Sequence, residues 1–187
     1  MSMILQPALT QEAVATWPLD QQDFDLTSRW LADERNAQWL DFGGASGVLT
    51  PLSLRIMSQR SHHCVWVYGP AEGSPAGVVA LGNIQRRFRT AEAWFVLGAK
   101  EHARQDLTVS ALGRLLEHGF TQLDLRCIHA WTVEINRGGR RVLERLGFRL
   151  AGRLRESHTI GDRAYDRLWF DLLAHEFKGY GKDDRRI

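Results

Sequence analysis

Short apolar runs rich in β-branched residues occur in the first half of the chain and are typical of β-strands. They predict strands over residues 12–17, 64–68, 76–81 and 93–97. A turn rich in glycine and proline separates the second run from the third, and a basic connection over 85–89 precedes the fourth. The first half of the chain therefore contributes four predicted strands.

Apolar residues at helical spacing lie between the first two of these strands. The pattern predicts one helix from Asp23 towards Phe42, ended by a cluster of glycines. Thr50 followed by Pro51 predicts the start of a second helix, because a capping hydroxyl and a proline at the first helical position both favour initiation. This second helix is expected to end near His62.

Helices and strands alternate in the second half of the chain. The predicted elements are a helix over 107–121, a strand over 127–133, a helix between Asn136 and Gly147, and extended runs over 148–159 and 164–172. The complete predicted order is strand, two helices, three strands, helix, strand, helix and two strands. Such a mixture predicts an α/β or α+β domain.

Composition and charge narrow the class of protein. A chain of 187 residues favours one domain, expected over 1–178, with a polar tail at 179–187. The net charge of +2 argues against a nucleic-acid or membrane partner held by bulk electrostatics. No apolar run approaches the roughly 18 to 20 residues that span a bilayer. Two cysteines give no disulfide framework, and no basic segment precedes the first apolar run, so we expect a cytoplasmic protein.

Motifs near the C-terminal end add a family resemblance to this order of elements. The stretch 135–148 reads INRGGRRVLERLGF and is followed by GRLRE at 152–156 and by YD at 165–166. The chain resembles the GNAT superfamily of N-acetyltransferases, and its RimJ/RimL-like branch most closely, over roughly residues 10–177. The resemblance implies a mixed, twisted sheet of about six to seven strands, splayed between strands 4 and 5 and flanked by about four helices.

The same resemblance implies acetyl-CoA as co-substrate, bound where the sheet opens. Its pantetheine arm is expected along the fourth strand, at Phe95, Val96 and Leu97. Its pyrophosphate is expected on the turn that opens the next helix, because free N–H groups and the helix dipole favour an anion there. Five residues of that turn are the expected contacts: Arg104, Gln105, Asp106, Leu107 and Thr108.

This turn departs from the family pattern Arg/Gln-x-x-Gly-x-Gly/Ala. Asp106 and Thr108 stand at the two positions where small residues let the backbone approach the phosphates. Asp106 caps the helix well, and the same carboxylate repels a pyrophosphate. Lys100, His102 and Arg104, just upstream, could offset this repulsion by binding phosphate from the side. Sequence alone does not rank these two effects.

A second departure lies in the helix after Asn136. The RimJ/RimL-like pattern Asn-x-x-Ser carries a serine that can protonate the departing thiolate, and Gly139 stands in its place. Asn136 suits either a helix N-cap or a hydrogen bond to the pantetheine or substrate amide, and both roles are compatible. Arg140 and Arg145, in the same helix, are expected nearest to the CoA phosphates.

Acetyl transfer to an amine needs a base, a donor to the thioester carbonyl and an acid for the thiolate. The candidate bases are Glu156, His158 and Glu92, and the candidate acid is Tyr165. Glu156 and His158 are two residues apart on a predicted strand, so they are expected to share one face. A backbone N–H near Val96 would serve as the carbonyl donor. No metal site is expected.

Three functional hypotheses follow. The first is an acyl-CoA-dependent N-acyltransferase that moves acetyl from acetyl-CoA to a primary amine, on a protein N-terminus or a small molecule, by direct attack in a ternary complex. The second is a non-catalytic binding module of the same fold, whose CoA turn Asp106 closes. The third is an RNA-associated module, because residues 137–167 hold nine arginines against four acidic residues. A homodimer through the last strands is compatible with each.

Overall fold

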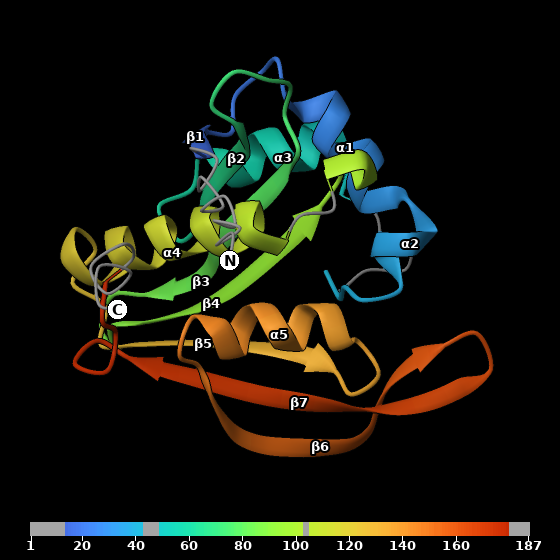
Figure 1. The fold of residues 1–187 in the computed structure, drawn as a ribbon, viewed down its shortest axis with the longest axis vertical. Coiled ribbons are helices and arrows are strands. Elements are labelled where there is room, and N and C mark those ends of the chain that lie inside the picture. The colour runs from blue at the N-terminus through green and yellow to red at the C-terminus, as the bar shows by residue number, and fades with distance from the viewer. Residues whose placement is uncertain (1–13, 43–48, 103–104, 180–187) are drawn as a thin grey trace, which may run out of the picture.

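The protein is described by a computed structural model over residues 14–42, 49–102 and 105–179. The elements in these ranges are β1 (Val14–Pro18), α1 (Phe24–Ala32), α2 (Glu34–Ala37), α3 (Pro51–Ser58), β2 (Cys64–Pro70), β3 (Gly77–Gln85), β4 (Thr90–Leu97), a 3-10 turn η1 (Lys100–His102), α4 (Gln105–Thr121), β5 (Cys127–Val133), α5 (Arg137–Arg145), β6 (Arg149–Ile160) and β7 (Arg163–Leu173) (Figure 1).

The strands form one sheet in the order β1-β2-β3-β4-β5-β7-β6. All neighbours are antiparallel except β4 and β5, which are parallel and pair only at Thr90–Cys127, Ala91–Ile128 and Glu92–His129. Beyond Glu92 the two strands separate (Figure 1). The predicted mixed sheet with a splay between its fourth and fifth strands is therefore confirmed.

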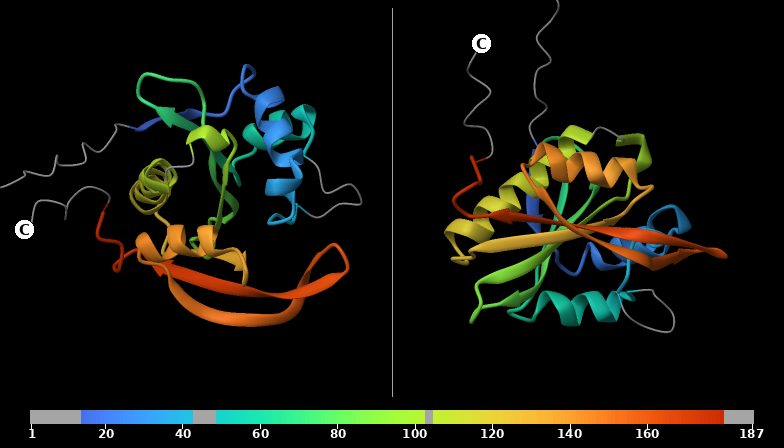
Figure 2. Two further views of the ribbon diagram at one scale, coloured as in Figure 1. Left: turned by 45° about the vertical axis from the view of Figure 1, so that its right-hand side comes forward. Right: turned by 90° about the horizontal axis from the view of Figure 1, so that it is seen from below.

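Helices cover both faces of the sheet. Figure 2, in its left view, shows α4 on one side of β2–β4 and α1 with α3 on the other. Strand β3 serves both layers, because Val79 and Leu81 pack into the core beneath α4 while Val78 and Ala80 pack beneath α1 and α3. This two-sided burial explains why residues 76–81 form a continuous apolar run.

The predicted single helix from Asp23 towards Phe42 is wrong in its length. Asp33 has an extended backbone (φ −61°, ψ 122°) and breaks the helix into α1 and α2, and its side chain accepts a hydrogen bond from the Arg35 amide at 2.9 Å. The helical spacing continues on both sides of the break, so the pattern could not reveal it. After α2, residues 38–42 run as an irregular segment, here called the 38–42 segment, towards the open part of the sheet.

The start of α3 is confirmed, since the Thr50 hydroxyl accepts a hydrogen bond from the Ser53 amide at 3.1 Å and Pro51 opens the helix. The helix ends at Ser58 and not near His62. In the described ranges, no helix is long and apolar enough to cross a membrane.

The last two predicted strands form the long hairpin β6–β7. Its register shifts between Leu150 and Gly152 and again between Leu154 and His158. Glu156 lies in the second irregularity with φ +48°, and its amide N–H donates to Asp166 Oδ1 at 2.8 Å. The hairpin extends past the end of β5, on the side of the molecule where α2 lies (Figure 1).

Candidate active site

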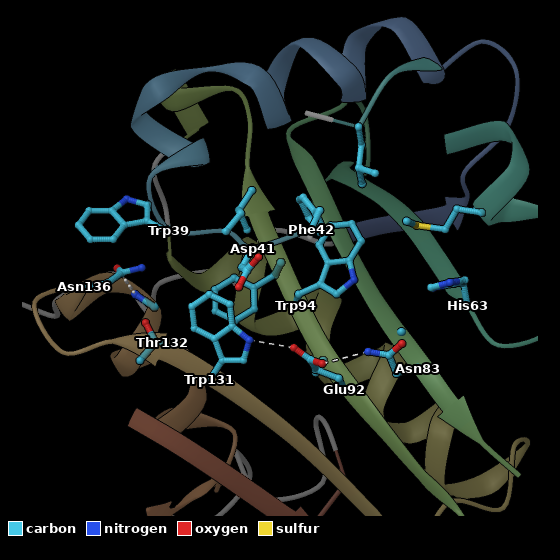
Figure 3. A pocket seen from close by; sticks show the side chains of 17 residues that line it. Trp39, Asp41, Phe42, His63, Asn83, Glu92, Trp94, Trp131, Thr132 and Asn136 are labelled. Atoms are coloured by element: carbon cyan, nitrogen blue, oxygen red, sulfur yellow. Dashed lines mark hydrogen bonds between the residues drawn. The ribbon is translucent and has the colours of Figure 1, made fainter. Parts of the chain in front are cut away.

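A cavity of about 470 Å³ opens where β4 and β5 separate. The 38–42 segment, β3, β4, β5 and the start of α5 all contribute to its wall (Figure 3). Its lining includes Trp39, Asp41, Phe42, His63, Asn83, Glu92, Trp94, Phe95, Trp131, Thr132, Asn136 and Gly139. The acidic side chains among them are Asp41 and Glu92, and we call this space the acidic cavity.

A second cavity, of about 290 Å³, lies on the other side of the same opening. It is lined by Arg35, Asn36, Trp39, Leu40, Phe95, Val96, Leu97, Lys100, Thr108, Asn136, Gly138, Gly139 and Val142. Its charged lining residues are Arg35 and Lys100, and we call it the basic cavity. The two cavities share Trp39, Leu40, Phe95, Asn136 and Gly139, so they meet at these residues.

Glu92 is held in the acidic cavity by two neutral donors. Its Oε1 accepts from Trp131 Nε1 at 2.9 Å and its Oε2 from Asn83 Nδ2 at 3.2 Å (Figure 3). Asn83 has φ +50° at an irregularity of the β3–β4 register, which turns its amide towards Glu92. Among the described residues no cationic side chain pairs with Glu92. Its charge is therefore available to a cation that enters the cavity.

His63 also lines the acidic cavity, and its Nδ1 is buried without a partner among the described residues. Burial lowers the pKa of the His63 imidazole, and the neighbouring His62 and Arg60 lower it further. Both effects favour the neutral form of the ring over the charged form.

Thr132 lines the acidic cavity beside Gly139, which lines both cavities. The Asn136 side chain caps α5 by accepting from the Gly139 amide at 2.9 Å. A Cβ at Gly139 would lie 3.0 Å from Thr132 Oγ1, so the glycine leaves room for this hydroxyl beside the turn. Sequence reasoning missed Thr132, and the available signal was a polar residue at a buried position of a strand, where it is 4% exposed.

The predicted residues Glu156, His158 and Tyr165 belong to the β6–β7 hairpin, and neither cavity includes them in its described lining. Glu156 is exposed, whereas His158 is 7% exposed, with Nε2 2.7 Å from the Gln38 carbonyl oxygen. The expectation that Glu156 and His158 share one face is wrong, because the irregularity at Glu156 breaks the alternation. Tyr165 lies opposite His158 in the register of the hairpin.

The predicted pantetheine strand does line a cavity, since Phe95, Val96 and Leu97 all border the basic cavity. Lys100 ties the end of this strand to α2, because its Nζ donates to the Leu97 carbonyl at 2.8 Å and to Asn36 Oδ1 at 2.5 Å. Burial lowers the pKa of Lys100, and the positive charge of Arg35 lowers it further.

The predicted pyrophosphate turn is only partly described. Arg104 and the Gln105 side chain lie outside the described residues. Asp106 is exposed and pairs with Arg145 at 2.7 Å between Oδ1 and Nη1. Leu107 is 3% exposed and packs in the core. Thr108 borders the basic cavity, with its hydroxyl 2.7 Å from the Tyr68 hydroxyl.

The arginines of residues 137–167 are largely engaged with carboxylates. Arg140 pairs with Glu144 one helical turn away, and it is absent from the described lining of both cavities. Five of the nine arginines form ion pairs with carboxylates of the described residues: Arg140, Arg145, Arg149, Arg153 and Arg167. This cluster is therefore in large part an ion-paired surface.

The two tryptophans of the predicted first helix have different roles. Trp30 packs against the core and lies directly over Gly98, where a Cβ would come within 1.9 Å of the indole. Trp39 lies in the 38–42 segment and lines both cavities. Of these two tryptophans, therefore, only Trp39 is placed to contact a molecule bound in either cavity.

Comparison with known families identifies the class of protein that has this fold. Residues 9–149 match the family model described as acetyltransferase (GNAT) domain, and the chain belongs to this family. The resemblance inferred from the sequence motifs is thereby confirmed.

Individual relatives carry consistent names. A putative ribosomal N-acetyltransferase, YdaF of Bacillus subtilis (strain 168), is 28% identical over 108 residues, which span 58% of each chain. The crystal structure of Vibrio cholerae spermidine N-acetyltransferase with CoA and spermine is 20% identical, with a TM-score of 0.77 over 87% of this chain and 96% of that one. Mycobacterium smegmatis RimJ with CoA-disulfide is 23% identical, with a TM-score of 0.72 over 89% and 84%.

Proposed function

We propose that this protein is an acyl-CoA-dependent N-acyltransferase that moves acetyl from acetyl-CoA to a primary amine in a ternary complex. The observation that carries the proposal is a pair of cavities that meet at Phe95, Asn136 and Gly139. Asp41 and Arg35 are held in ion pairs with Arg167 and Asp33, so the charges that distinguish the two cavities are those of Glu92 and Lys100. An anionic acyl donor suits the basic cavity, and a cationic amine suits the acidic one. Their junction is the place where the two substrates would react.

The acyl donor would lie along β4 with its pantetheine beside Phe95–Leu97, which border the basic cavity. Beyond Glu92, β5 does not pair with β4, so backbone groups on this edge are free to bond a ligand. A backbone N–H near Val96 or Leu97 would polarise the thioester carbonyl. Lys100 would attract the negative charge of the donor, and Asn136 would bond the pantetheine or the acceptor amide.

The amine would enter the acidic cavity as an ammonium ion and be drawn to Glu92. The Glu92 carboxylate first accepts a proton from the ammonium ion and passes it to solvent, which frees the nitrogen lone pair. The neutral nitrogen then attacks the thioester carbonyl carbon and becomes cationic in the tetrahedral intermediate, and Glu92 accepts its second proton. The C–N bond forms and the C–S bond breaks. The thiolate then takes a proton from the Thr132 hydroxyl, which is replenished from solvent. Thr132 thus replaces Tyr165 as the proposed acid.

The acceptor is proposed only as a primary amine, on a small molecule or a protein N-terminus. The relatives include a protein named for spermidine and one named as a ribosomal N-acetyltransferase. We therefore propose both a small-molecule amine and a protein N-terminus as candidate acceptors. The matched region spans 58% of the length of the first of the curated relatives.

A non-catalytic binding module is the second candidate, and the observation in its favour is Asp106. Its carboxylate stands at the first small position of the phosphate turn and holds Arg145, so it both repels a pyrophosphate and occupies a candidate phosphate ligand. Tight acetyl-CoA binding with turnover would end this alternative.

The test is acetyl-CoA-dependent CoA release over a panel of amines that includes spermidine and a short peptide with a free N-terminus. We expect turnover in the wild type and a fall in kcat/KM for the amine of about 100-fold or more in Glu92→Gln, the magnitude of a lost general base. Glu72→Gln, at an exposed turn, is the matched control and should behave as the wild type. A folded protein that releases CoA with none of the amines would contradict the proposal.

A further inference from the structure

The 38–42 segment forms a wall of the acidic cavity without belonging to a helix or strand. Trp39, Asp41 and Phe42 all come from it (Figure 3). Its apolar side chains Leu40 and Phe42 pack against the core, and its polar groups need partners elsewhere in the fold. Two residues of the β6–β7 hairpin, more than 100 positions away in sequence, make such contacts: His158 and Arg167.

His158 bonds on both sides of its ring. One nitrogen, Nε2, lies 2.7 Å from the Gln38 carbonyl oxygen, and the other, Nδ1, lies 3.2 Å from an Arg167 guanidinium nitrogen. A carbonyl only accepts and a guanidinium only donates. Both contacts are therefore satisfied together only by the neutral ring with its proton on Nε2. At 7% exposure this arrangement is shielded from competing water.

Arg167 links His158 and the 38–42 segment to Trp131, which holds the proposed base Glu92. The same guanidinium nitrogen pairs with Asp41 Oδ2 at 2.6 Å, and the guanidinium carbon lies 4.2 Å from the centre of the Trp131 ring. Trp131 in turn donates to Glu92. A continuous chain of contacts thus joins the 38–42 segment to the Glu92 carboxylate, and the stacked guanidinium fixes the plane of the indole that holds it.

We propose that His158 and Arg167 are positioning residues of the acceptor site. They clamp the 38–42 segment to the β6–β7 hairpin and hold Trp131 so that Glu92 points into the acidic cavity, and neither touches the amine itself. The inference rests on the proposed function for its kinetic part, because it assigns the acidic cavity to the acceptor. The clamp itself is a structural statement that does not depend on catalysis.

The kinetic test uses two substitutions of His158 that separate its contacts. Glutamine can present an amide N–H near the place of Nε2 and so keep the bond to Gln38, whereas asparagine is too short to reach it. We expect His158→Asn to raise KM for spermidine or the peptide by about tenfold, the effect of one lost buried hydrogen bond, with KM for acetyl-CoA within about twofold. His158→Gln should recover most of the difference.

Arg167→Lys is the second probe, because lysine keeps the charge and loses the planar stack on Trp131. It should raise the amine KM as His158→Asn does, whereas Arg163→Lys, at the exposed start of β7, should change neither KM. Equal changes in both KM values, or a change in neither, would overturn the positioning role.

Limited proteolysis with chymotrypsin tests the clamp without any turnover. Cleavage after Trp39, Leu40 or Phe42, followed by mass spectrometry, should be about tenfold faster in His158→Asn than in the wild type or His158→Gln, because the lost contact raises the open population. An unchanged cleavage rate in this segment would overturn the clamp. If the wild type acetylates no amine but the cleavage pattern is as expected, the proposed function fails and the clamp stands. Should His158→Asn fail to fold, Arg167→Lys takes its place in both assays.

Discussion

The basic and acidic cavities share five lining residues but are built in different ways. The basic cavity is bordered by consecutive residues of β4, Phe95–Leu97, and by the first turn of α5. The acidic cavity draws its polar groups from the 38–42 segment, β3, β4 and β5, and they are fixed by contacts to one another. We expect the donor to bond mainly to the backbone of β4 and the acceptor to bond mainly to side chains. Substitutions should therefore affect binding of the acceptor more readily than binding of the donor.

After Glu92, the largest expected effect is at Thr132, which lines the acidic cavity beside Gly139. Thr132→Val keeps the shape of the side chain and removes the hydroxyl that we propose protonates the thiolate. We expect kcat to fall about 10- to 100-fold, with the KM of both substrates little changed. The measurement is steady-state CoA release, and Thr121→Val, on the exposed side of α4, is the control.

A second substitution makes this prediction sharper. Thr132→Ser is the matched variant, because serine keeps the hydroxyl and removes only the methyl group. A kcat near the wild-type value in Thr132→Ser, beside a loss in Thr132→Val, supports the assignment. Wild-type kcat in Thr132→Val alone would remove Thr132 from the mechanism.

Lys100 offers a way to weaken the donor side alone. Lys100→Met removes the positive charge from the basic cavity and keeps the length of the side chain. Calorimetry should show acetyl-CoA binding weakened by about tenfold, in the range of a lost charge-assisted contact, while the amine KM is unchanged. The exposed Lys178→Met is the control. A rise in the amine KM of Lys100→Met would contradict the division of the two cavities by charge.

Substitution of Asp106 should strengthen acetyl-CoA binding, whereas substitution of Lys100 should weaken it. Asp106→Gly removes a carboxylate from the phosphate turn and frees Arg145 from its ion pair. The pair is exposed, so solvent screens it, and we expect acetyl-CoA binding to tighten only about threefold. Titration of the Asp106→Asn variant separates the charge from the added flexibility of glycine. Weaker binding in both variants would show that the Asp106–Arg145 pair assists the donor.

The smallest expected effect is on the pH dependence of the free energy of unfolding, through His63 in the acidic cavity. The pKa of His63 is lowered by burial, so the unfolded chain binds this proton at a higher pH than the folded protein does. Stability should therefore fall as pH drops through and below the ordinary histidine range near about 6.5. Urea unfolding at several pH values between about 5.5 and 7.5 should show a shallower dependence in His63→Gln. The same slope in both proteins would contradict this account of His63.

Elements with strong local signals were predictable from the sequence. Residues 127–133 form β5 as predicted, and Thr50 with Pro51 opens α3, because an apolar run and a capping sequence are signals contained in the neighbouring residues. The break at Asp33 was not predictable, since the helical spacing of apolar residues continues across it. The irregularity at Glu156 depends on a bond to Asp166 ten residues away, which no periodicity reveals.

The donor side was also easier to predict than the acceptor side. The expected pantetheine strand, Phe95–Leu97, does border the basic cavity, because consecutive residues of one strand carry that information. Glu92 was one of three candidate bases, and only its pairing with Trp131 and Asn83 in space distinguishes it. Asp41 and Thr132 were not predicted at all, because they come from segments that only the folded sheet brings together.

The most direct test of the account is a calorimetric titration of the wild-type protein with acetyl-CoA, with thermal unfolding measured beside it. The account predicts saturable micromolar binding and a gain in apparent stability of about 2.7 kcal/mol at a hundredfold excess over Kd. Absence of binding at millimolar acetyl-CoA, restored by Asp106→Gly, would contradict it. The carboxylate would then close the donor site, and the protein would be a binding module on an acetyltransferase fold.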